Sequence, residues 1–161
     1  MPILHIQLNA KGNNVQGHLI EVPPSIVLQR QGPFVKVTIG LAQSIASQLL
    51  QQGQTLPSPV SGIALIDTGA STTCVDDSVA QQMQLPVVNV VNIASASHAS
   101  TKQNVYPIQI EVIGLPISIE TPNAIGAALG AQGLIALIGR DVLQHCTLFY
   151  NGITGSFTLS I

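Results

Sequence analysis

The stretch ALIDTGA, residues 64–70, constrains this chain more than any other. Its apolar residues 64–66 predict a strand that enters a core, and Asp67 stands where that strand must stop. Thr68 and Gly69 then supply a small hydroxyl and a residue with free backbone angles, so the turn can bring main chain close to a bound molecule. A carboxylate in this place is costly unless it is used or hydrogen-bonded.

A DTG triplet alone is more often an ordinary turn between strands than a catalytic centre. Here, however, a second characteristic stretch, ALIGRDVL, follows about seventy residues later at residues 136–143. Together the two stretches resemble the retropepsin-like aspartic proteases, the single-domain relatives of retroviral proteases. That family has an apolar pair before DTGA or DSGA, and later an apolar-apolar-Gly followed by Arg and Asp or Asn. The resemblance covers residues 60–161.

The resemblance implies a mainly β fold, a closed β-barrel of the acid-protease type with one or two short helices. It makes Asp67 the catalytic residue, supported by its own loop: Thr68, Gly69 and Ala70. Residues expected to pack under that loop are Leu137, Ile138, Gly139 and Arg140. Relatives often pair the arginine with an aspartate shortly after DTGA, whereas this chain has hydroxyl residues at 71–73. Its acceptor is therefore left open between Asp76, Asp77 and a carbonyl.

A second set of candidates would contact substrate. Val87–Ile93 and Val105–Ile113 predict a hairpin, and its small, polar connection lies where the family has the flap that closes over substrate. The connection lacks glycine, and an ordinary exposed hairpin tip is the alternative interpretation. Substrate-binding candidates are Ser71, Ser95, Ala96, Ser97 and His98, the last as an exposed residue rather than a catalytic base.

Hydrolysis by the aspartic mechanism needs two carboxylates about 3 Å apart that share one proton. The chain has seven acidic residues but only one D[ST]G triplet. A competent site therefore predicts a homodimer in which the two Asp67 side chains meet on a twofold axis. Two alternatives remain: a non-proteolytic module of the same fold that dimerises or binds peptides, and a monomer completed by a partner domain.

Composition excludes several other classes of function. The five basic residues are scattered singly and the net charge is −2, so no nucleic-acid footprint exists. No apolar stretch approaches the ~20 residues of a membrane helix, and the first residues do not form a signal peptide, so we expect a soluble chain, cytoplasmic by default. Glycines 126, 130 and 133 do not match a nucleotide-binding pattern, and no cofactor is expected.

Cys74 and Cys146 lack metal-site spacing, so no metal site is expected. Two buried thiols are the favoured interpretation, and a disulfide between them stays open. The chain is expected to be one domain, 1–161, in which 60–161 form the catalytic core. Residues 1–59 add short strands, among them 26–28, and an amphipathic helix over 41–52. A further helical turn is expected over 79–85, capped by Asp77 or Ser78.

Overall fold

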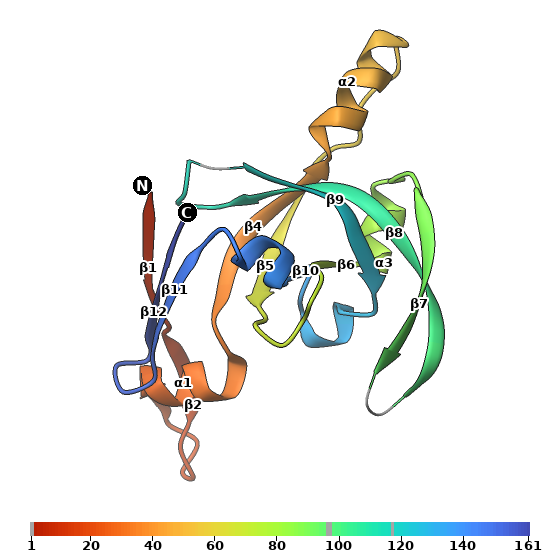
Figure 1. The fold of residues 1–161 in the computed structure, drawn as a ribbon. Helices are drawn as coiled ribbons and strands as arrows, with labels where there is room; N and C mark the ends of the chain where they lie inside the picture. Colours follow the sequence, from red (N-terminus) through yellow and green to blue (C-terminus); the bar gives the residue numbers. More distant parts are fainter. Residues whose placement is uncertain (1, 96–97, 117) are drawn as a thin grey trace.

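Six strands close into a barrel in the computed structural model, which describes residues 2–95, 98–116 and 118–161. Each strand is hydrogen-bonded to the next, and the last pairs with the first (Figure 1). In spatial order they are β4 (Phe34–Leu41), β5 (Val60–Ile66), β10 (Ala136–Ile138), β6 (Cys74–Asp76), β9 (Ser118–Ala127) and β8 (His98–Val112). The predicted mainly β fold with a closed barrel is confirmed.

Alternation along the strands builds the core of the barrel. Val35, Val37 and Ile39 of β4, and Ile108 and Ile110 of β8, are each at most 1% exposed, while the residues between them on β4 are more accessible. Branched side chains at every second position fit a pleated surface that is buried on one face. The hydrophobic pattern thus fixes which face of each strand points inward.

Parallel pairing places the two diagnostic stretches side by side. β5 and β10 pair in register, with Ala64 opposite Ala136, Leu65 opposite Leu137 and Ile66 opposite Ile138. Along its other edge, β10 pairs with β6 in the antiparallel sense. Two apolar triplets that are about seventy residues apart in the sequence therefore deliver their following residues to the same end of the barrel.

A second sheet of three strands stands beside the barrel (Figure 1). Its order is β1 (Ile3–Gln7), β12 (Ser156–Ser160) and β11 (Thr147–Asn151), all antiparallel. A C-terminal hairpin forms through the antiparallel pairing of β11 with β12. Phe157 and Leu159 point into the core and are at most 1% exposed, which attaches this sheet to the barrel.

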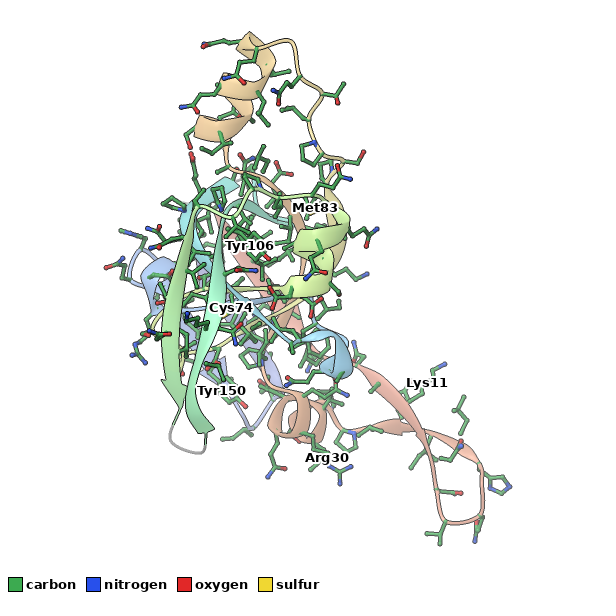
Figure 2. The ribbon with its side chains drawn as sticks, turned by 90° about the vertical axis from the view of Figure 1, so that its right-hand side faces the viewer. Lys11, Arg30, Cys74, Met83, Tyr106 and Tyr150 are labelled. Atoms are coloured by element: carbon green, nitrogen blue, oxygen red, sulfur yellow. The ribbon has the colours of Figure 1, made fainter. Side chains whose placement is uncertain are left out.

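A separate hairpin projects away from the barrel (Figure 2). It consists of β2 (Ala10–Asn13) and β3 (Leu19–Val22), with Lys11 paired opposite Glu21. Its turn is ordered by Asn14, whose side-chain oxygen accepts the N–H groups of Gln16 and His18.

The helices are short, and the described residues contain four of them where one or two were expected. They are α1 (Pro24–Gln31), α2 (Gln43–Gln51), α3 (Asp77–Gln82) and α4 (Arg140–Leu143), with a single 3-10 turn η1 (Gly130–Gln132). The predicted helix over 41–52 is confirmed as α2, which stands out from the end of the barrel in Figure 1. Across the described ranges, no helix has the length and apolar character that a membrane crossing requires.

Two local predictions are wrong. Residues 26–28 are helical rather than extended, because Pro24 occupies the first turn of α1, where its fixed φ favours a helix. The cap of α3 is Asp76 rather than Asp77 or Ser78, since its carboxylate accepts the N–H groups of Ser78 and Val79. The period of a short apolar run does not distinguish a strand from a buried helix.

Candidate active site

Strand β5 carries Asp67 to the end of the barrel. Ala64 and Ile66 are buried, and the side chains of Leu65 and Asp67 lie on the other, more accessible face of the strand. The N–H of Asp67 donates to the carbonyl of Ile138 at 3.0 Å, which extends the β5–β10 pairing by one residue. The chain then leaves the sheet, because the following Thr-Gly pair turns it back.

The Asp67 carboxylate is held by its own loop. Oδ1 accepts the N–H of Gly69 at 2.8 Å and that of Ala70 at 3.3 Å. The described residues provide no hydrogen bond to Oδ2, and the residue is only half-buried. One oxygen is therefore fixed by main chain while the other has no hydrogen-bond donor among the described residues, which is an arrangement that acid–base chemistry can use.

Helix α4 donates hydrogen bonds to the main chain of this loop. The N–H of Arg140 donates to the carbonyl of Ala70 at 2.9 Å, and that of Asp141 donates to the carbonyl of Ser71 at 3.3 Å. The Arg140 guanidinium donates through Nη1 to the carbonyls of Thr68 at 2.9 Å and Gly69 at 3.1 Å. The open question about the acceptor of Arg140 is thus resolved in favour of carbonyls of the Asp67 loop.

A buried network beneath the loop was missed in the sequence. The Asp141 carboxylate accepts the N–H of Thr73 at 3.0 Å and its hydroxyl at 2.7 Å, and the Thr73 oxygen accepts the N–H of Gly139 at 3.0 Å. Thr73 is fully buried. An acidic residue in the first turn of a helix is the signal that could have drawn attention to Asp141.

Gly139 allows this close packing. A Cβ on Gly139 would lie 2.6 Å from the carbonyl carbon of Thr72 and 2.8 Å from the nitrogen of Thr73. Two main-chain segments therefore touch where only glycine fits. Leu137 pairs with both Leu65 and Cys74, and Ile138 is 1% exposed, so the two apolar residues before Gly139 lie in the barrel wall.

The remaining predicted substrate contacts are only partly described. Ser71 is exposed beside the loop. The expected hairpin exists as β7 (Asn89–Ser95) paired with β8, with Ser95 opposite His98. Ala96 and Ser97 lie outside the described residues. β7 runs toward the same end of the barrel as β5 in Figure 1.

Both thiols are free, which answers the disulfide question for this structure. Burial, with Asp141 and Asp67 nearby, raises the pKa of Cys74 to about 11. Burial also raises the pKa of Cys146. A thiol with a raised pKa stays protonated near neutral pH and is a poor nucleophile. No three His, Cys, Asp or Glu side chains among the described residues could together hold a metal ion.

A pocket of about 530 Å³ lies beside strand β5, where it is lined by Leu65, two residues before Asp67. Its walls come from the C-terminal end of α1, the start of β4, strand β5 and the segment before β10: Arg30, Gln31, Phe34, Ile63, Leu65, Gln132, Gly133 and Leu134. Residues 26–28 of α1 were expected to be extended, and no sequence pattern indicated this pocket. It places apolar side chains next to the strand that carries Asp67.

Two solved structures that resemble this chain are distant from it in sequence. A retropepsin-like aspartic protease from Rickettsia conorii is 12% identical with a TM-score of 0.48, and the match covers 98% of this chain and 90% of that one. The retroviral protease-like domain of Ddi1 from Leishmania major is 15% identical with a TM-score of 0.39, over 73% of this chain and 81% of that one. No curated protein matches the chain.

The sequence profile of one family, described as gag-polyprotein putative aspartyl protease, matches residues 60–145. The matched range contains the DTGA loop, the hairpin β7–β8 and the Gly-Arg-Asp stretch that grips the loop. It covers more than half of the 161 residues, so the chain belongs to the gag-polyprotein putative aspartyl protease family and has the retropepsin-like fold expected of it.

Proposed function

We propose that this protein is an aspartic endopeptidase that acts as a homodimer, with one Asp67 from each chain. The observation that carries the proposal is the state of Asp67: Oδ1 is fixed by two main-chain N–H groups, and the residue is only half-buried at the end of a strand. Of the other acids near the loop, Asp141 is engaged by Thr73. The second catalytic carboxylate is therefore expected from another chain.

In the proposed mechanism the two Asp67 carboxylates share one proton. The ionised Asp67 takes a proton from a water molecule, which attacks the carbonyl carbon of the peptide bond. The protonated Asp67 donates a hydrogen bond to the carbonyl oxygen and then supplies the proton that the leaving nitrogen needs. The OH of the water joins the carbonyl carbon, one Asp67 keeps the proton taken from the water, and the other has given its proton to the nitrogen, so the pair again shares one proton.

The loop residues have supporting roles in this proposal. The exposed Thr68 hydroxyl would bond across the twofold axis and brace the two loops, while Gly69 and Ala70 would present main chain to the peptide. Ser71 would add an uncharged contact. Arg140 and Gly139 would act as positioning residues, because both contact the loop rather than the reacting atoms.

The hairpin β7–β8 is proposed as the flap that covers the substrate and excludes water. Residues 1–161 are proposed as one domain, because β4 is a barrel strand that pairs with both β5 and β8. The 1–59 part therefore belongs to the same core as the proposed catalytic part.

The decisive experiment compares the wild-type protein with Asp67→Asn on an unfolded polypeptide between about pH 3 and pH 7. Loss of the carboxylate is expected to lower cleavage by about 10²–10⁴-fold, the size of a lost acid–base catalyst. The mass in sedimentation should remain that of a dimer. Undiminished cleavage by the Asn variant would remove Asp67 from the mechanism.

A second outcome would favour a different function. If the wild-type protein cleaves nothing over that pH range but binds apolar peptides, it is a peptide-binding module of the same fold. The apolar pocket beside β5 makes this the alternative to test in parallel.

A further inference from the structure

The pocket beside the proposed site is built partly from the N-terminal segment that the family match does not include. Arg30, Gln31 and Phe34 precede residue 60, where that match begins. Gly32 ends α1 with a φ of 78°, and a Cβ there would lie 2.8 Å from the Leu65 side chain. The end of α1 is therefore pressed against β5, two residues before Asp67.

The pocket and the Asp67 carboxylate lie along one face of β5. Ile63, Leu65 and Asp67 alternate with buried Ala64 and Ile66, so the first three side chains leave the strand on the same side. Residues two apart on a strand are separated by about 6.6–6.8 Å. An extended peptide whose scissile bond lies at Asp67 would thus place a side chain near Leu65.

The chemistry of the lining is divided. Phe34, Ile63, Leu65 and Leu134 offer apolar surface, while Arg30 in the last turn of α1 brings a positive charge to the same pocket. Arg30 is exposed, and within the described ranges its guanidinium has neither a carboxylate partner nor a hydrogen-bond acceptor. The labels in Figure 2 place Arg30 on α1 below the barrel, apart from Lys11 on the projecting hairpin.

We propose that this pocket binds peptides in which a large apolar side chain is followed or preceded, two positions away, by an acidic one. The apolar side chain fills the space against Leu65, and the acidic side chain pairs with Arg30. The spacing of two follows because alternate side chains of an extended peptide point to the same side. The inference rests on the proposed function for its location, since it names the substrate class of that same site.

A binding experiment tests the pocket without requiring turnover. Fluorescent nonapeptides carry Phe at the centre and Glu, Gln or Lys two residues away on either side, and bind to the Asp67→Asn protein in an anisotropy titration. We expect the Glu peptide to bind about two- to five-fold more tightly than the Gln peptide, which is the effect of one exposed charge pair. Replacing the central Phe by Ser should abolish measurable binding.

Charge-changing variants then assign the preference to a residue. Arg30→Gln should equalise the Glu and Gln peptides, and Arg30→Glu should reverse the order so that the Lys peptide binds best. Lys11→Gln removes the same charge from the hairpin and should change nothing. Lys36 of β4 pairs opposite Ile63 of β5, which lines the pocket, so Lys36 is the other basic residue that could cause the preference. The Lys36→Gln variant tests this competing explanation.

The outcomes separate the inference from the function on which it rests. The inference would be overturned if the Glu, Gln and Lys peptides bound equally well. It would also be overturned if the preference for the Glu peptide survived Arg30→Gln and disappeared in Lys36→Gln. Either result would count against it even if the wild type cleaves peptides. An Arg30-dependent preference in a protein that never cleaves would support the inference and refute the peptidase.

Discussion

Two aspartates nine residues apart, Asp67 and Asp76, each end a strand but meet opposite environments. Asp76 is 3% exposed, and its oxygens accept the N–H groups of Ser78, Val79, Leu129 and Gly130 together with the Ser78 hydroxyl. Asp67 is half-buried and accepts two N–H groups of its own loop through one oxygen.

The two environments decide what each carboxylate can do. A buried charge must be satisfied, and the donors around Asp76 use both of its oxygens to join α3 to the segment before β10. Such a group stabilises the fold but offers nothing to a substrate. Asp67 keeps enough partners to fix its orientation and enough exposure to meet another molecule.

The largest effect on stability is expected from removing the buried carboxylate. Asp76→Ala leaves the buried N–H groups of Leu129 and Val79 without their acceptor, so the free energy of unfolding should fall by about 3–5 kcal/mol. Asp67→Ala should cost less than about 1 kcal/mol, because its loop is near solvent. Urea unfolding of the two variants measures the difference, and equal losses would show that the two carboxylates contribute alike to stability.

Close packing beneath the Asp67 loop gives the next effect. Gly139→Ala places a methyl group 2.6 Å from the carbonyl carbon of Thr72, and overpacking of this kind costs about 1–3 kcal/mol. Cleavage should fall as well, because the displaced backbone leads into the loop. Gly40→Ala is the matched control, since nothing lies within 4 Å of the added atom. Equal thermal stability of the two variants would contradict this account of Gly139.

The pH dependence of stability separates the two aspartates further. Burial alone would raise the pKa of Asp76, but hydrogen bonds from Ser78, Leu129, Val79 and Gly130 outweigh it and lower the pKa below its ordinary 3.8. Because the folded-state pKa is the lower one, this stabilisation is present above the unfolded pKa and is lost as pH falls through the folded one.

Stability of the wild type and Asp76→Asn, measured by urea unfolding from about pH 6 to pH 2, should therefore converge as the pH falls below about 4. The Asn variant cannot ionise, so it lacks this contribution at every pH. A constant gap over the whole range would show that ionisation of Asp76 contributes nothing to stability.

The smallest effect is expected from Arg140→Lys. Nη1 of Arg140 reaches two carbonyls of the loop, whereas an ammonium on a flexible stem holds them less rigidly. Stability should change by less than about 1 kcal/mol, because the side chain is exposed. The kcat for peptide cleavage should fall several-fold with little change in KM. An unchanged kcat would remove Arg140 from the positioning of Asp67.

The sequence predicted much of the fold because its strongest signals are local. The helix over 41–52 and the β7–β8 hairpin each follow from short-range patterns, and they are confirmed. The family followed from two short motifs. Residues 26–28 were misassigned because a three-residue apolar run has no distinctive period. Pro24, in the first turn of α1, favours the helix there.

The chain's own order of residues supplied the DTGA turn, the apolar triplets and the lone catalytic candidate, since those depend on neighbours in the sequence. Only the folded chain, through the pairing of β5 with β10 and the packing of α1, brought Asp141 to Thr73, Arg140 to the carbonyls of Thr68 and Gly69, and α1 to the side of Leu65. These contacts join residues separated by tens of positions, and their energies depend on three-dimensional distance rather than on sequence spacing. The supports of Asp67 are for that reason a property of the folded barrel.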